Sequence, residues 1–258
     1  MKLKALTLLP LLAGGFLGSQ PTLGQEMSLA EIAQVYRQAQ GGGMVLDGLD
    51  SIRINGVRRI GGQSKAFTLL RKRPDLYRLN MYSEADNGVV HFAYDGEQAW
   101  RWDHTGYEAQ RVNLSSEPLI AQDIEFFNPL LSLGQNRSKL DYLGNVSVPS
   151  DRGGLRKAMH LRYRNRFGDA EDIFLDPNTY LVFRLVYRPN TEANPIVSYF
   201  SDYRQVAKGY MVPYEVLHKV MREDAEVTIG YTRVENVEIN PGLLSLYFRP
   251  PKVNSPES

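Results

Sequence analysis

Cysteine is absent from this sequence of 258 residues. Its absence excludes disulfide bonds, thiolate metal sites, cysteine nucleophiles and membrane attachment through a lipidated N-terminal cysteine. An excess of one charge sign is also lacking, because 30 Lys and Arg stand against 29 Asp and Glu. A nucleic-acid-binding protein gains affinity by neutralising phosphates, so the balanced charge predicts no nucleic-acid partner.

Motifs for catalysis and metal binding are lacking as well. The four histidines, at positions 91, 104, 160 and 218, are far apart, and none stands in an H-x-x-x-H or H-E-x-x-H spacing. We therefore expect solvated surface histidines and no metal. No G-x-S-x-G motif occurs, and the glycine run at residues 41–43 has no lysine, so neither phosphate-loop pattern fits. The sequence predicts no catalytic residue, no cofactor and no enzymatic activity.

Only the N-terminus carries a long apolar run. Lys2 and Lys4 precede uncharged residues 5–17, and the sequence then breaks into Gly-Ser-Gln-Pro at residues 18–21. The run is too short to cross about 30 Å of hydrocarbon comfortably, and it has the order of a secretory signal peptide. We predict a signal peptide over residues 1–24, and a soluble, exported mature chain of one domain over residues 25–258. In a bacterium with two membranes this chain would lie in the periplasm; an uncleaved N-terminal anchor is the alternative.

Two segments have helical patterns. The first begins at Ser28, which forms an S-x-x-E capping box with Glu31, and the glycines at 41–43 end it. The second covers residues 118–127, where four residues form an apolar stripe: Leu119, Ile120, Ile124 and Phe127.

Most other segments alternate between apolar and polar residues, which is typical of strands with one buried face. Such alternation places Tyr77, Leu79 and Met81 opposite Arg78 and Asn80. The same alternation marks other sets of apolar residues: Val90, Phe92 and Tyr94; Trp100 and Trp102; Met159, Leu161 and Tyr163. About ten such segments, with turn residues between them and no βαβ pattern, predict a mainly β protein with a few helices. We expect a single antiparallel sheet, strongly curved or closed, with one apolar face.

Charged clusters have two interpretations each. Adjacent acids, such as Glu171 and Asp172, could suggest carboxylate catalysis or a calcium site, but solubilising turn acids are the better interpretation. Arg162, Arg164 and Arg166 could form a solvated strand face or a docking patch for anionic headgroups or an acidic partner.

Four segments together resemble the bacterial periplasmic lipoprotein-sorting carriers of the LolA/LolB type. The chain from Ala93 to Asp103, AYDGEQAWRWD, is similar to the family's strand, DG turn and Trp-containing strand. The other three are FLDPNTYLVFRLVYRP at 174–189, the segment 203–216 with Gly209 and Pro213, and NPGLLSLYFRP at 240–250. The resemblance implies an incomplete, half-open barrel whose concave side is covered by helices and encloses an apolar cavity.

The resemblance also implies a function. The family carries acyl chains of a lipoprotein or lipid toward the outer membrane and works with transport components of the inner and outer membranes; we expect a monomer. An alternative is a periplasmic sensing or interaction module, of the sigma-factor-regulator type, on the same fold. We predict that the acyl chains contact ten residues, although packed core is the alternative for about half of them: Tyr77, Leu79, Met81, Phe92, Tyr94, Trp100, Trp102, Met159, Leu161 and Tyr163. We further expect both tryptophans to share a face with Phe92 and Tyr94 across the turn at Asp95 and Gly96.

Overall fold

The computed structural model describes residues 27–83, 88–105, 108–126, 129–131, 139–165, 167–190, 192–223 and 225–251. The predicted signal peptide lies outside these residues. The elements are α1 (Leu29–Ala39), α2 (Gly43–Asp47), β1 (Ser51–Ile60), β2 (Gln63–Lys72), β3 (Leu76–Ser83), β4 (Gly88–Tyr94), β5 (Ala99–Asp103), β6 (Gln110–Val112), α3 (Pro118–Ala121), β7 (Lys139–Pro149), β8 (Leu155–Arg164), β9 (Ala170–Leu175), β10 (Val182–Arg188), β11 (Ile196–Gln205), β12 (Met211–Arg222) and β13 (Ala225–Ile239), with short 3₁₀ turns at Leu114–Ser116, Ala207–Gly209 and Ser245–Phe248.

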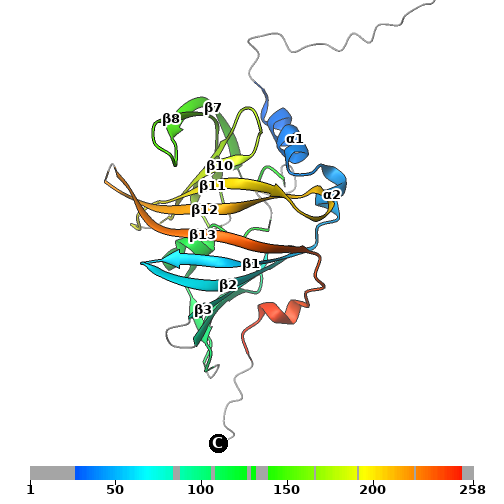
Figure 1. Ribbon diagram of the computed structural model, residues 1–258, viewed down its shortest axis with the longest axis vertical. Helices are drawn as coiled ribbons and strands as arrows, with labels where there is room; N and C mark the ends of the chain where they lie inside the picture. The colour runs from blue at the N-terminus through cyan, green and yellow to red at the C-terminus, as the bar shows by residue number, and fades with distance from the viewer. Residues whose placement is uncertain are drawn as a thin grey trace, which may run out of the picture.

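The strands form one antiparallel sheet in the order β6-β5-β4-β3-β2-β1-β13-β12-β11-β10-β9-β8-β7. Strands β1–β6 and β7–β13 are two consecutive meanders, and the pairing of β1 with β13 joins them (Figure 1). Strands β6 and β7 are the two edges, and among the described residues no ladder joins them. The predicted mainly β fold with a curved, unclosed sheet is confirmed.

Helix α1 begins as the sequence predicts. The Ser28 backbone N–H donates to Glu31 Oε2 at 2.8 Å, and the Glu31 N–H donates to Ser28 Oγ at 3.3 Å, which completes the capping box. The helix ends before Gly41, whose φ is 115°. A Cβ at position 41 would lie 2.7 Å from the Gly209 carbonyl oxygen, so only glycine fits there. Helix α2, which follows directly, was not predicted.

The second predicted helix is much shorter than expected. Helix α3 ends at Ala121, and the chain continues in turns to Phe126; Phe127 lies outside the described residues. Ile120 and Ile124 are buried as the apolar stripe predicts. Gln122 and Asp123, which follow the helix, contact distant strands, as described below.

The inner face of the sheet holds two apolar clusters. One packs α1 and α2 against β8–β10, through residues such as Ile32, Tyr36 and Leu161. The other covers β2–β5 and includes Phe67, Leu79 and Ile124. The core therefore lies between the inner face, the helices and the segment that follows α3.

Strands β9 and β10, and residues 196–199 of β11, are buried on both faces, whereas the sequence predicts one apolar face throughout. Their outer residues, Phe174, Val186, Val197 and Tyr199 among them, form a third cluster with Val148 of β7. Tyr199 Oη lies 3.4 Å from the Pro149 carbonyl oxygen at the end of β7. The twisted sheet thus brings this end of β7 over the outer face of β11.

The tryptophans lie on the outer face, so the prediction that they share a face with Phe92 and Tyr94 is wrong. Trp102 pairs with His91, and Trp100 pairs with Ala93, whereas Phe92 pairs with Arg101. Directly opposed residues share a face. The loop between Tyr94 and Ala99 has four residues, and an even number of loop residues places even-numbered positions of β4 opposite odd-numbered positions of β5.

Candidate functional site

Eight of the ten predicted residues line the inner face. The β2–β5 cluster contains Tyr77, Leu79, Phe92 and Tyr94, with Met81 packed against it, and the β8–β10 cluster contains Met159, Leu161 and Tyr163. Trp100 and Trp102 are the exceptions. Contact of the eight with an acyl chain stays a prediction.

Residues 117–126, here called the plug segment, cross the inner face and join the two clusters. Ile120 and Ile124 belong to the β2–β5 cluster, and Ala121 belongs to the β8–β10 cluster. These three side chains are at most 7% exposed. The plug segment therefore covers the apolar surface where the two clusters meet.

Polar contacts hold the plug segment to the strands. Ser198 Oγ lies 3.2 Å from Gln122 Oε1, and Tyr163 Oη donates to Glu125 Oε2 at 2.9 Å. Other contacts join Arg58 Nη2 to Asp123 Oδ2 (3.9 Å), Arg71 Nη2 to the Glu125 carbonyl oxygen, and the Phe126 N–H to Asp75 Oδ1 (2.9 Å). These polar contacts, together with the burial of Ile120, Ala121 and Ile124, hold the segment against the inner face.

A buried polar chain runs across the inner face of β11, β12, β13 and β1. Ser198 Oγ lies 3.1 Å from His218 Nδ1, His218 Nε2 lies 3.1 Å from Thr232 Oγ1, and Arg58 Nε donates to Thr232 Oγ1 at 3.0 Å. Burial, with a smaller contribution from the Arg58 charge, lowers the pKa of His218 to about 3, so the imidazole is neutral at pH 7.

The Ser198 and His218 pair resembles a nucleophile and its base, but its setting is that of a structural contact. Ser198 is 0% exposed, and the second imidazole nitrogen meets a hydroxyl group instead of a carboxylate. The expectation of a surface histidine is wrong for His218. The sequence held one indication of this burial: His218 alternates in phase with the apolar residues Val216 and Val220, and out of phase with Lys219.

A buried carboxyl group also faces the plug segment. Burial, together with the charges of Glu125 and Asp169, raises the pKa of Glu171 to about 8. Tyr187 Oη donates to Asp169, and Asn165 lies within hydrogen-bond distance of Asp169. Glu171 is therefore protonated at neutral pH, and the expectation that it is a solvated turn acid is wrong.

A pocket of about 520 Å³ opens on the inner side of the sheet edge formed by β5 and β6. Tyr94 and Phe167 form part of its wall, with ring centroids 6.2 Å apart in an edge-to-face arrangement. The other lining residues are Glu97, Gln98, Ala99, Arg111, Val112, Asn113 and Leu114. Its volume lies in the range of small-molecule sites, and its apolar wall continues into the β2–β5 cluster.

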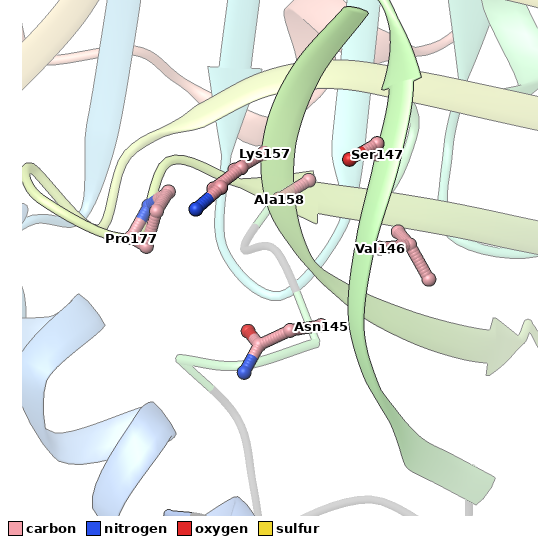
Figure 2. A pocket seen from close by; sticks show the side chains of 6 residues that line it. All are labelled: Asn145, Val146, Ser147, Lys157, Ala158 and Pro177. Carbon is pink, nitrogen blue, oxygen red and sulfur yellow. The ribbon is translucent and has the colours of Figure 1, made fainter. Parts of the chain in front are cut away.

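Two other pockets among the described residues lie away from the two inner-face clusters. One, of about 410 Å³, is at the β7–β8 edge, where Figure 2 shows Asn145, Ser147 and Lys157 pointing toward the side of Pro177 while Val146 points away. The three polar side chains are exposed, which makes this pocket a poor site for an apolar chain. The other, of about 430 Å³, is on the outer face and includes Trp102.

The arginines of β8 have partners within the protein. Asp172, which is buried, contacts Arg162 Nε at 2.7 Å, Arg188 Nη2 at 3.0 Å and His160 Nε2 at 3.0 Å. These partners hold the pKa of the Asp172 carboxyl well below its usual range despite its burial. Arg164 donates to the Gly168 carbonyl oxygen, and Arg166 lies outside the described residues. Because Arg162 and Arg164 contact groups of the protein itself, the arrangement favours an ordinary strand face over a docking patch.

In the described part of the chain, no group of three or more His, Asp or Glu side chains is placed to hold a metal ion. Nor does any helix there have the length and apolar character needed to cross a membrane.

Solved structures of other proteins share this fold at low sequence identity. No model of a known protein family matches the sequence, and no curated protein matches it. A LolA superfamily protein from Nitrosomonas europaea superposes with a TM-score of 0.59 at 12% identity, over 86% of this chain and 96% of that one. A DUF1329 family protein from Desulfovibrio piger gives 0.59 at 15% identity, over 86% and 95%. A domain named for outer membrane lipoprotein sorting, from Vibrio parahaemolyticus, gives 0.57 at 12% identity, over 85% and 95%. The fold that the sequence resemblance implies is therefore confirmed.

Proposed function

We propose that this protein is a soluble periplasmic carrier that binds the acyl chain of a lipid or lipoprotein on its inner face and shuttles it toward the outer membrane. One observation carries the proposal: an apolar inner face is covered by a plug segment that polar contacts hold, next to a pocket at the open sheet edge whose wall is partly apolar. The names of two structures with this fold, which refer to LolA and to lipoprotein sorting, agree with this function.

Energetics agree with such a role. Burial of each CH₂ group stabilises a complex by about 0.8 kcal/mol, so a chain of sixteen carbons gains on the order of 10 kcal/mol before ordering costs. Part of this gain replaces the contacts of the plug segment, which lowers the net affinity and permits release. We further propose that residues 1–24 are a cleaved signal peptide, that residues 25–258 act as one domain and as a monomer, and that membrane transport components load and unload the carrier.

The direct test is mass spectrometry of lipids extracted from the protein purified from its native compartment. A stoichiometric lipid or acylated peptide supports the carrier, whereas lipid-free protein favours a sensing module on the same fold.

A matched pair of variants tests the position of the chain. Val112 lines the edge pocket, and Val89 lies on the outer face, where it pairs with Tyr82. Val112→Phe should fill the pocket and weaken the binding of a fluorescent fatty acid, whereas Val89→Phe should not. Equal effects of the two substitutions would contradict the placement of the chain at this edge.

A further inference from the structure

Three inner-face side chains next to the plug segment carry hydrogen-bond donors in an apolar setting. Arg58, Arg71 and Tyr77 lie on β1, β2 and β3, and Arg71 and Tyr77 are direct cross-strand partners. Tyr77 is 0% exposed and Arg58 is 6% exposed. Tyr77 belongs to the β2–β5 cluster, so leucine and phenylalanine side chains surround its ring.

Around Arg58 and Arg71, the positive charges outnumber the nearest negative charge, which is that of Asp123. Asp123 of the plug segment faces both guanidinium groups, and each of them lowers the pKa of its carboxyl, which burial raises. The ion pair itself is loose, with 3.9 Å between Arg58 Nη2 and Asp123 Oδ2. Arg71 Nη2 donates to the Glu125 carbonyl oxygen, which carries no full charge. Two cations therefore share one carboxylate in a poorly solvated place.

At this place, two buried groups of Arg71 and Tyr77 have no hydrogen-bond partner among the described residues. They are the Tyr77 hydroxyl and Arg71 Nε. Buried polar groups are nearly always paired, and an exception calls for a ligand, ion or water that completes the site. Arg71 Nε can only donate a hydrogen bond, and the Tyr77 hydroxyl can donate one, so a single acceptor would satisfy both groups.

We propose that Arg58, Arg71 and Tyr77 form an anion subsite that binds the oxyanion head, a carboxylate or phosphate, of a single-chain amphiphile, and that the Asp123 carboxylate stands in for this head when the plug segment is seated. The inference rests on the proposed carrier function and names its ligand class. Guanidinium groups suit oxyanions because they offer several donors in one plane, and a charge-assisted hydrogen bond is about twice as strong as a neutral one. The surrounding apolar cluster receives the chain that follows the head. When the ligand enters, its oxyanion head takes the place of the Asp123 carboxylate, and the plug segment is released in the same step.

The test uses three probes with the full chain: hexadecanoate, hexadecan-1-ol and inorganic phosphate. Tyr77→Phe removes a hydroxyl that has no partner in the described structure, so melting temperature should stay unchanged or rise. We expect this variant to bind hexadecanoate about tenfold more weakly and hexadecan-1-ol with unchanged affinity. Tyr82→Phe, on the outer face of the same strand, is the matched control and should change neither.

A second variant tests the stand-in role. Asp123→Asn removes the competing charge, so it should tighten hexadecanoate binding and leave hexadecan-1-ol binding unchanged. Equal effects of either variant on acid and alcohol, or weaker hexadecanoate binding by Asp123→Asn, would overturn the subsite while the carrier function stands. Failure of both amphiphiles to bind would overturn both proposals. Phosphate that binds as tightly as hexadecanoate would show a free-anion site and overturn the amphiphile assignment.

Discussion

The indole of Trp102 stacks on the imidazole of His91, with ring centroids 5.1 Å apart and planes inclined by 23°. The Arg78 guanidinium lies over the same indole at 5.2 Å, and Trp102 is 7% exposed. This stack lies on the outer face, away from the clusters that would shield an acyl chain.

Tryptophan fluorescence should therefore be insensitive to lipid and sensitive to acid. Adding hexadecanoate should leave the emission unchanged, because neither tryptophan lines the inner face. Burial lowers the pKa of His91 to about 4, with a further contribution from Arg78, so acidification through that pH should protonate the imidazole and quench Trp102. A pH titration of the emission measures the step, and His91→Gln should abolish it. A saturable shift on adding lipid would instead place the ligand on the outer face.

Stability should depend on the protonation of Glu171. Its ordinary pKa is 4.5 and its pKa in the folded chain is about 8. Between these values the folded protein holds a proton that the unfolded chain has released, so stability falls as pH rises through this range. Glu171→Gln keeps the neutral form and should raise the melting temperature at pH 9, by about 2–4 °C for each kcal/mol of repulsion removed, with little change at pH 5. Glu97→Gln, in an exposed turn, is the control; the same gain at both pH values would refute the assignment.

The capping box of α1 should contribute measurably to stability. Ser28→Ala removes the acceptor for the Glu31 N–H and should lower the free energy of unfolding by about 1 kcal/mol. Ser28→Asp keeps an acceptor and should lose little. Urea unfolding compares the two, and a loss with Asp as large as with Ala would show that the cap is not the cause.

Gly41 should tolerate no side chain. Gly41→Ala combines a φ of 115° with a Cβ only 2.7 Å from the Gly209 carbonyl oxygen, so we expect a loss above about 1 kcal/mol. Gly61 also has a positive φ, of 57°, but its added Cβ would meet nothing within 4 Å. Gly61→Ala therefore isolates the backbone cost, and losses of equal size in urea unfolding would argue against the steric contact.

Local features were predictable because they depend on neighbouring residues. The cap at Ser28 and Glu31 spans three positions, and the inner-face assignment of Tyr77 and Leu79 follows from the period of a strand. The face of Trp102 was not predictable in the same way, because it depends on the length of the loop between β4 and β5. One residue of error there reverses every side chain on the second strand.

The polar part of the candidate site could not be derived from local pattern. Gln122 meets Ser198 across 76 positions, and Arg58 meets Thr232 across 174 positions. Contacts between residues so far apart in the sequence produce no periodic pattern from which they could be predicted. Gln122 and Asp123, directly after the short α3, contact strands that the sequence pattern could not place beside them.

The seam between β1 and β13 has a consequence for how the chain acquires its structure. Each meander is built from hairpins of near neighbours, whereas at the seam Ile52 pairs with Ile239, and Asn240 Oδ1 accepts from the Asp50 N–H across 190 positions. Closing so long a loop is the slow, entropically costly part of β-sheet assembly. We expect the two meanders to form early and independently, and the seam to zip last, after the final strand has emerged. Until then, β1 and β13 are bare strand edges, and chaperone capture of the newly made chain should be directed at them.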